Sequence, residues 1–275
     1  MGFIKGNTLP LLKEHQKRPF SGSLLFLGYP DVYFTPDQFR KMCLNLKLEL
    51  DSSVKLDITN RPGFRRKGFI SADSLFKSLG FKEVSSLDYS QFEGASIAFD
   101  LNAPQPPSEL LDRYDFIMDH GTLEHVFHLP HALNNIFTML RVGGRVFISS
   151  PTSNFVDHGF YMFSPTLLYD FFTANKFEIN TILVAQSSPQ QQTDPSFYTE
   201  YEPGSLNNVS YGGLNNSIYY TICIAQKTEQ STGHIIPQQG LYTNEVWTSN
   251  RSSRYRRLFK KVIGAAKRSI LGTSK

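Results

Sequence analysis

The chain is poor in the residues that cross-link secreted proteins. Among its 275 residues there are two cysteines, Cys43 and Cys223, which lie far apart in unrelated contexts. This spacing provides neither a disulfide framework nor a cysteine metal site. A reducing compartment is therefore favoured, and we expect a cytoplasmic protein.

Long apolar runs are also missing. Charged residues such as Lys5, Lys13 and Arg18 interrupt residues 1–20, and no later run is long enough to span a bilayer. We therefore expect neither a signal peptide nor a membrane span.

Several catalytic motifs are absent from the sequence: Gly-x-Ser-x-Gly, Cys-x-x-Cys and His-Glu-x-x-His. Their absence argues against the corresponding nucleophile and zinc chemistries. His125, His128 and His131 are spaced three residues apart around Pro130, which indicates the start of a helix more than a metal cage. We expect no metal.

Acidic residues are lacking at one end of the chain. Residues 251–275 hold nine Lys or Arg and no Asp or Glu, which leaves 19 basic against 24 acidic residues in the rest. The net charge of +4 therefore belongs to this tail. Residues 254–271 can form a basic amphipathic helix, typical of an element that binds an anionic membrane surface at roughly 1 kcal/mol per basic residue. A helix docked on its own domain or on a partner is an equal alternative. RNA binding is weaker, because no aromatic platform accompanies the charge.

From Ser23 onward, short apolar runs alternate with helix-like stretches, which is typical of βα units and a largely parallel sheet. The predicted strands are residues 24–27, 83–87, 96–99, 116–118 and 145–149. Proline after a capping residue predicts helices that begin at Pro36 and Pro165. Two further helices are predicted from Ser71 and across Leu133–Leu140, each ended by glycine.

The last part of the chain has a different texture. Two β-rich runs, 179–185 and 218–225, are separated by a polar stretch, which favours an antiparallel closing pair. The predicted organisation is an N-terminal extension (1–22), an α/β domain (23–227), a linker (228–250) and the basic helix (251–275). Residues 47–68 are interpreted as a loop insertion.

Polar residues follow the predicted strands where ligands of open α/β sheets bind. Gly28 and Tyr29 follow the first strand, and Asp88 and Tyr89 follow the second. The third is followed by Asp100, Leu101 and Asn102, and the fourth by Asp119, His120, Gly121 and Thr122. Asp88 can accept hydrogen bonds from ribose hydroxyls or be a surface turn residue. Asp100 can accept from an adenine amino group or cap a turn before Pro104.

The stretch Tyr114–Phe127, with its Leu-Glu-His triplet, then Met139-Leu-Arg-Val-Gly-Gly-Arg-Val146 and a strand that ends at Pro151, resembles the centre of class I S-adenosylmethionine-dependent methyltransferases. The resemblance covers about residues 23–225. It implies S-adenosylmethionine as cofactor and a Rossmann-like, doubly wound, mostly parallel seven-stranded sheet whose last strand is antiparallel.

The departure from the family lies at the first strand. The family has Gly-x-Gly-x-Gly there, where missing Cβ atoms let the backbone approach the methionine part of the cofactor. This chain has Leu27-Gly28-Tyr29-Pro30-Asp31. A divergent subgroup with a rebuilt loop is the preferred interpretation, and a relative that has lost cofactor binding is the alternative.

Methyl transfer is an in-line displacement, so a base is needed only when the acceptor must lose a proton. His125 and His158 are the candidate bases because imidazole titrates near neutral pH. His125 has packing or helix capping as an equal alternative, and Glu124 a positioning role. Phe155, Phe160, Tyr161 and Phe163 are expected to line the substrate side.

The sequence thus predicts a methyltransferase with a small-molecule or glycan-like acceptor and no nucleic-acid partner. Its basic tail could also bind the protein peripherally to the inner face of a membrane. The alternative is a non-catalytic, methyltransferase-like scaffold targeted by that tail. A nicotinamide-dependent oxidoreductase comes third, because the glycines and a Tyr-x-x-x-Lys pair are missing.

Overall fold

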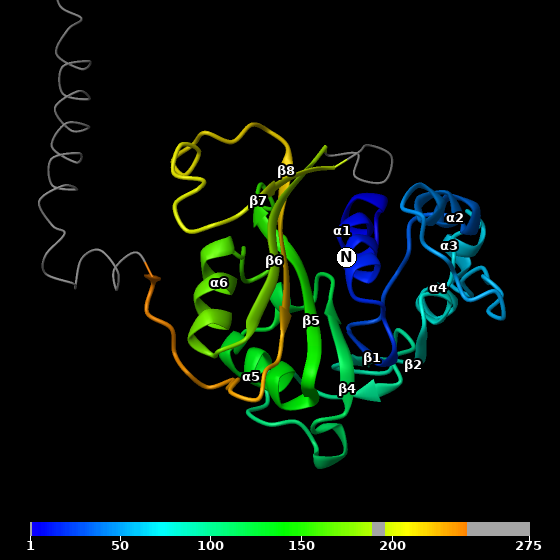
Figure 1. The fold of residues 1–275 in the computed structure, drawn as a ribbon, viewed down its shortest axis with the longest axis horizontal. Helices are drawn as coiled ribbons and strands as arrows, with labels where there is room; N and C mark the ends of the chain where they lie inside the picture. Colours follow the sequence, from blue (N-terminus) through cyan, green and yellow to red (C-terminus); the bar gives the residue numbers. More distant parts are fainter. Residues whose placement is uncertain (1, 189–195, 241–275) are drawn as a thin grey trace, which may run out of the picture. The chain divides into compact units, whose positions relative to one another are not determined.

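A computed structural model describes residues 2–188 and 196–240, and Figure 1 shows a sheet flanked by helices on both faces. The sheet has eight strands in the order β3-β2-β1-β4-β5-β8-β6-β7. The strands are β1 (Gly22–Leu27), β2 (Phe81–Asp88), β3 (Ile97–Ala98), β4 (Tyr114–Asp119), β5 (Leu140–Ser153), β6 (Glu178–Ser187), β7 (Phe197–Glu200) and β8 (Ile218–Gln226). The first five pair in parallel, whereas β8 is antiparallel to both β5 and β6.

This topology confirms the predicted doubly wound α/β class, with one strand more than the seven expected. The additional strand, β7, lies in the polar stretch and pairs antiparallel with the outer side of β6. Three of its four residues are exposed, so an edge strand of this kind carries little hydrophobic alternation.

Two of the helices begin with the capping contacts that the sequence predicts. They are α1 (Lys5–Lys17), α2 (Pro36–Asn45), α3 (Pro62–Arg65), α4 (Ala72–Ser78), α5 (Leu129–Met139) and α6 (Pro165–Ala174), with 3₁₀ turns η1 (Ser108–Leu110) and η2 (Leu123–His125). Thr35 and Gln38 form a capping box at α2, and the Ser164 hydroxyl accepts from the Leu167 amide at α6.

Two helical features differ from the sequence prediction. Helix α5 ends at Met139 rather than at the glycines, because β5 already begins at Leu140 and Gly143 serves a turn with φ +82°. The predicted N-terminal extension contains α1, whose Leu11 and Leu12 are fully buried. Its apolar residues cluster without a helical stripe that the sequence could reveal.

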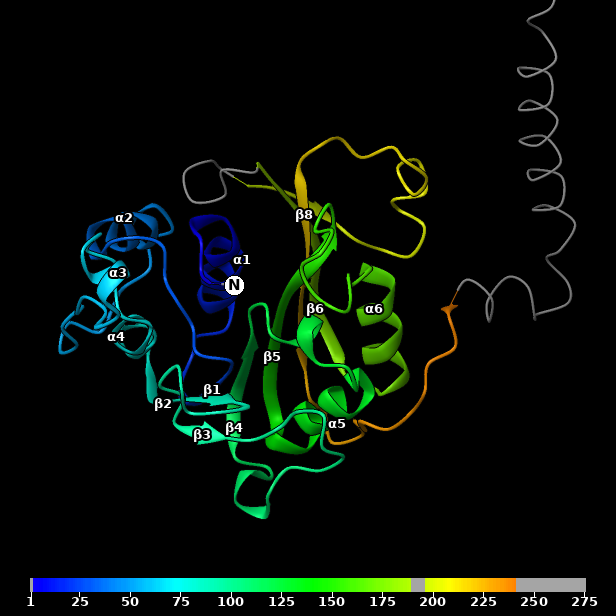
Figure 2. The ribbon, with the colours of Figure 1, turned by 180° about the vertical axis from the view of Figure 1, so that it is seen from behind.

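Alternation along the strands divides the core into two clusters. Leu25, Leu27 and Ile117 face α5 and α6 on one side of the sheet. Leu24 and Phe26 face α1, α2 and α4 on the other side. Figures 1 and 2 show these helices in two layers on opposite faces of the sheet. Both cysteines are buried and free, which accords with the absence of a disulfide framework.

The segment after β8 is tied to the domain as far as Ile235. The Asn175 side chain donates to the Ile235 carbonyl and accepts from Thr232 Oγ1, at 3.0 and 2.9 Å. The chain divides into a compact unit, Met1–Ile236, and a second unit, Pro237–Lys275, of which residues 237–240 are described. The predicted basic helix lies outside the described residues. Among the helices that are described, none is long and apolar enough to cross a membrane.

Candidate functional site

The candidate site lies at the carboxyl edge of the parallel strands, where the strand order reverses between β1 and β4. In register, Leu27 of β1 pairs with Leu87 of β2 and with Asp119 of β4. The three strands therefore end at one level, and the residues that follow them gather at one edge. An edge of this kind, beside a reversal of strand order, is the usual ligand site of open α/β sheets.

Gly28 and Thr122 close the gap between the ends of β1 and β4. The Thr122 hydroxyl donates to the Leu27 carbonyl at 2.7 Å, and the Gly28 amide donates to the Leu87 carbonyl at 2.7 Å. Gly28 has φ +78°, and a Cβ placed there would lie 2.5 Å from Thr122 Oγ1. The missing Cβ at Gly28 thus makes room for Thr122 in this structure.

Tyr29 is held against the loop that follows β2. The Arg61 guanidinium lies 5.3 Å from the centre of the Tyr29 ring. It also forms ion pairs with Asp31 at 2.7 Å and Glu93 at 3.3 Å. Arg61 comes from the predicted loop insertion, so a segment distant in sequence fixes the rebuilt first loop. Sequence reasoning missed Arg61, since no motif marks it.

Asp88 keeps one carboxylate oxygen without a hydrogen bond in the described part of the chain. Its Oδ1 accepts from the neighbouring Tyr89 amide at 2.6 Å, and its backbone carbonyl accepts from the Phe99 amide at 2.8 Å. The Asp88 residue is half-buried, whereas the Tyr89 side chain is 77 % exposed. Asp88 therefore retains an acceptor at the strand end.

Asp100 and Asn102 form a local turn beside Asp88. Asp100 Oδ1 accepts from the backbone amide and the side-chain amide of Asn102, at 2.9 and 2.8 Å. Asn102 Oδ1 in turn accepts from the His128 amide at 2.9 Å, while Leu101 is buried in the core. These contacts match the interpretation of Asp100 as a turn cap. The second carboxylate oxygen of Asp100, Oδ2, has no hydrogen-bond partner in the described chain.

Asp119 uses both oxygens inside the protein. Oδ1 accepts from the amides of Thr122 and Leu123 at 3.0 and 3.1 Å, and Oδ2 accepts from the Ser150 hydroxyl at 3.0 Å. Burial raises the pKa of this carboxyl, and the three hydrogen bonds oppose that rise. Asp119 therefore shapes the loop 119–122. Ser150 was missed although it directly follows the predicted fifth strand, 145–149, and the residues that follow the other predicted strands were considered.

The His120 ring lies on the opposite face of the sheet from the turn that Asp119 holds. It packs at 4.3 Å from the Phe3 ring, and neither ring nitrogen has a hydrogen bond in the described chain. Burial lowers the pKa of His120 to about 3. Its side chain is thus part of the core between α1 and the sheet, and Gly121, also buried, continues the loop.

The three predicted catalytic residues do come together. His158 Nε2 lies 3.6 Å from Glu124 Oε1, and the rings of His125 and His158 are 5.1 Å apart. Glu124 is fully buried, and neither of its carboxylate oxygens has a hydrogen-bond partner among the residues that the structure describes. Burial and the Asp119 carboxylate raise the pKa of Glu124, and burial lowers the pKa of both histidines.

The loop after β5 is fastened to η2 at the Glu124 backbone. The Glu124 carbonyl accepts from the amides of Phe160 and Tyr161 at 2.8 and 3.2 Å. A Cβ at Gly159 would lie 2.8 Å from that carbonyl, so only glycine permits this approach. Next to it, Asp157 has φ +65°, a conformation that costs about 1–2 kcal/mol for a residue with a side chain. The loop thereby presents His158 to Glu124.

The aromatic residues expected on the substrate side divide into two groups. Phe160 is 64 % exposed, and the Tyr161 hydroxyl donates to the Phe127 carbonyl at 2.7 Å. Phe163, in contrast, is fully buried in the core, and Phe155 packs against Tyr220. Phe160 therefore remains available to a ligand, whereas Phe163 supports the fold.

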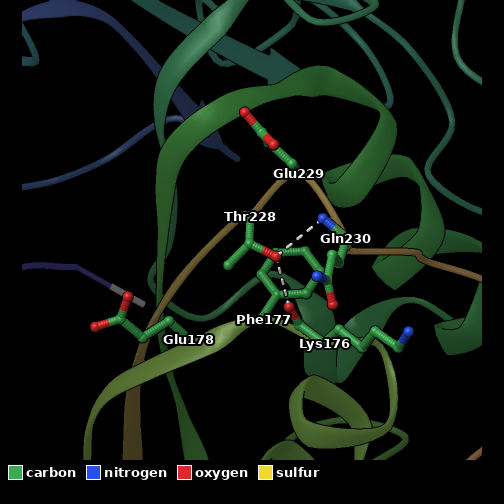
Figure 3. A pocket seen from close by; sticks show the side chains of 6 residues that line it. All are labelled: Lys176, Phe177, Glu178, Thr228, Glu229 and Gln230. Carbon is green, nitrogen blue, oxygen red and sulfur yellow. Dashed lines mark hydrogen bonds between the residues drawn. The ribbon is translucent and has the colours of Figure 1, made fainter.

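A separate open hollow has a volume of about 540 Å³. Figure 3 shows the residues that line it: Lys176, Phe177, Glu178, Thr228, Glu229 and Gln230. They lie at the start of β6 and directly after β8, which places them at the amino edge of the parallel strands. There the Thr228 hydroxyl donates to the Lys176 carbonyl at 2.9 Å and accepts from the Gln230 amide, so the hollow belongs to a turn and is separate from the candidate site.

Comparison with known proteins gives no matching family model and no matching curated protein. Among solved structures, the chain is similar to a possible histamine N-methyltransferase from Thermotoga maritima, described as S-adenosylmethionine-dependent (15 % identity, TM-score 0.37, 81 % of this chain and 91 % of that one). It is also similar to a 1,6-didemethyltoxoflavin-N1-methyltransferase from Burkholderia thailandensis with bound S-adenosylhomocysteine (14 %, 0.39, 80 % and 76 %).

A third similar structure is the CMeT domain of the citrinin polyketide synthase (12 % identity, TM-score 0.39, 81 % of this chain). The chain spans about half of that structure's length, 52 %. These likenesses concern the fold, and the solved structures that carry them include class I S-adenosylmethionine-dependent methyltransferases.

Proposed function

We propose that the chain is an S-adenosylmethionine-dependent methyltransferase that acts on a small-molecule or glycan-like acceptor. The observation that carries the proposal is the half-buried Asp88 at the end of β2, the strand next to the reversal of strand order, where one of its carboxylate oxygens has no hydrogen bond to the described residues. A carboxylate in this place suits the two hydroxyls of a ribose.

The residues fit the adenosine end of this cofactor better than its methionine end. Asp88 and Asp100 each have an oxygen without a hydrogen bond in the described part of the chain, and Tyr29 and Tyr89 lie at the same edge. At Gly28, however, the space left by the missing Cβ is taken by the Thr122 hydroxyl. We therefore assign the adenosine to the strand-end residues Asp88 and Asp100 and leave the methionine part unassigned.

The bound cofactor would supply an electrophilic methyl group, so the protein has to align the acceptor and accept a proton where the acceptor is a hydroxyl. His158 and His125 are the groups placed to accept that proton, because burial keeps both imidazoles neutral near pH 7. Asp119 acts as a positioning residue through its bonds to the loop 119–122.

Calorimetry with S-adenosylhomocysteine tests the proposal. We expect saturable binding to the full chain, and no heat from a folded sample would overturn it. The product is preferred to S-adenosylmethionine because it cannot be consumed during the titration.

A non-catalytic scaffold is the second candidate. The Gly28–Thr122 contact favours it, because the Thr122 hydroxyl occupies space beside the first loop, where the family places the methionine part of the cofactor. The two candidates differ in one measurement. A scaffold of this kind would bind neither cofactor form, whereas an enzyme binds at least the product.

A peripheral membrane site through residues 251–275 remains a proposal from the sequence alone. Its support is the run of nine basic residues without an acidic one. Nucleic acid is not proposed as a partner, because the tail holds two aromatic residues, Tyr255 and Phe259, against nine basic ones, which does not indicate a stacking surface.

A further inference from the structure

We infer that Glu124, His125 and His158 form a binding site for one divalent transition-metal ion. Each residue offers one ligand atom, and these atoms lie within 4.8 Å of one another. Among the described residues, this group alone has metal-ligand spacing. Two imidazoles and one carboxylate are a ligand set suited to Zn²⁺, Fe²⁺, Co²⁺ or Mn²⁺.

The first argument is the unsatisfied Glu124 carboxyl. It is fully buried, and both oxygens lack a hydrogen bond within residues 2–188 and 196–240. The nearby Ser150 hydroxyl has a single proton, which it donates to Asp119 Oδ2 at 3.0 Å. A buried carboxylate without a partner is costly unless a cation or a proton compensates it. The side chain is directed at His158, so the compensating cation belongs between the two residues.

The second argument is the distance between the ligand atoms. Two ligands of a tetrahedral ion bound at about 2.0–2.1 Å lie roughly 3.3 Å apart. The 3.6 Å between His158 Nε2 and Glu124 Oε1 is already close to this value. Nor does His158 Nε2 have any hydrogen-bond partner that a metal would have to displace. His125 has to approach further, and its exposed side chain has the freedom to do so.

The third argument is that the surrounding backbone brings these ligands together at a cost. His158 lies between Asp157, with φ +65°, and Gly159, whose missing Cβ leaves room for the Glu124 carbonyl. Two amides of the same loop donate to that carbonyl. Strained backbone that is held by neighbouring contacts is concentrated at functional sites. These contacts hold the loop after β5 against η2 at Glu124, next to the proposed ligands His125 and His158.

The ligand set comes from two segments and therefore differs from the histidine spacing in the sequence. His128 stacks on His131 instead, with ring centres 5.2 Å apart, and His131 Nδ1 bonds to the Asn102 carbonyl at 2.8 Å. Three protein ligands leave coordination positions for water or for an oxygen atom of a small ligand on the exposed His125 side. We therefore expect the additional ligand of the ion to be a molecule that coordinates through oxygen.

The test uses the full chain without an affinity tag, freed of metal with a chelator and then titrated with Zn²⁺ and with Co²⁺. We expect one ion per chain, measured by elemental analysis, and visible absorption from bound Co²⁺. Glu124→Gln, His125→Ala and His158→Ala should each weaken binding by more than about 100-fold, beyond the 10–100-fold typical of outer-shell partners. His128→Ala is the matched control, an exposed histidine of the same segment, and should bind normally.

Absence of binding for both ions, or binding that persists in His158→Ala, would overturn the inference. If Glu124→Gln unfolds, the two histidine variants decide, because their side chains are partly exposed. Metal binding and cofactor binding involve different residues and can be measured separately, whereas an ion bound to His125 and His158 would take up the nitrogen lone pairs with which these histidines otherwise accept a proton. S-adenosylhomocysteine binding is measured on the same metal-free protein, so that either can fail alone.

Discussion

The Thr122 hydroxyl occupies the space beside Gly28 while it donates to the Leu27 carbonyl, and so binds the end of β4 to the end of β1. The relationship is steric as well as hydrogen-bonded. We therefore expect a side chain at position 28 to clash with Thr122, a residue 94 positions later in the sequence.

Gly28→Ala should lower the free energy of unfolding by about 2–5 kcal/mol. The positive φ contributes about 1–2 kcal/mol, and the clash with Thr122 contributes about 1–3 kcal/mol. Gly143→Ala is the control, because Gly143 has φ +82° but no atom within 4 Å of the added Cβ. Urea unfolding should show the smaller loss there, and Gly28→Ala combined with Thr122→Ala should recover part of the difference. Equal losses at both glycines would contradict the steric argument.

Asp88→Ala should weaken S-adenosylhomocysteine binding by about 1–3 kcal/mol, as expected for a lost buried acceptor. Stability should change little, because the side chain makes a single hydrogen bond, to its neighbour Tyr89. Glu109→Ala is a suitable control, an exposed carboxylate in η1, which precedes β4. Calorimetry on the three proteins decides, and an unchanged affinity in Asp88→Ala would remove Asp88 from the site.

In contrast to Asp88→Ala, Asp119→Ala should mainly lower the stability of the folded chain. It leaves two amides and the Ser150 hydroxyl without their acceptor, at roughly 1 kcal/mol or more for each bond. A loss of about 3–5 kcal/mol in chemical unfolding is therefore expected. Wild-type stability in this variant would show that the loop 119–122 does not depend on Asp119.

His120 predicts acid sensitivity. Its pKa is lowered to about 3 in the folded chain, so the unfolded chain binds the proton first as the pH falls below 6.5. The stabilisation from neutral His120 is complete above pH 6.5 and is lost toward pH 3, at up to about 1.4 kcal/mol per pH unit.

His120→Phe should remove this part of the pH dependence while the ring contact with Phe3 is kept. Asp119 and Glu124 have raised pKa values and act in the opposite sense, but they are present in both proteins. The difference between the two stability curves therefore isolates His120. Parallel curves between pH 4 and 7 would show that His120 is not buried in neutral form.

Removal of residues 251–275 should abolish co-sedimentation with anionic liposomes and leave S-adenosylhomocysteine binding intact. The nine basic residues would otherwise contribute roughly 1 kcal/mol each near an anionic leaflet. Neutral liposomes provide the control. Co-sedimentation that survives the truncation would place the membrane contact elsewhere or exclude it.

Much of the fold could be predicted because its signals are local. The capping box at Thr35 and the proline at position 165 mark helix starts by chemistry within one turn. Strand β7 and helix α1 escaped prediction. The first is a largely exposed edge strand that forms against β6, and the second buries Leu11 and Leu12 only because the sheet lies beside it.

The candidate site shows the same division. The sequence placed Asp88, Asp119 and Glu124 at or after strand ends, but it could not tell which carboxyl has a partner. The Asp119 carboxylate is satisfied by its own loop and by Ser150, whereas the Glu124 carboxylate has no hydrogen-bond partner among the described residues. That difference depends on the direction of a few amides and hydroxyls, which are settled only when the strands are in register.

By itself the sequence determined the α/β class, the central strands and helices, and the strand ends at which polar residues collect, because periodicity, caps and turns act over a few residues. Only the tertiary structure decided that Thr122 occupies the space beside Gly28, that Arg61 holds Tyr29, and that His158 faces Glu124. Such contacts join segments far apart in the chain, and their geometry depends on how the whole sheet packs.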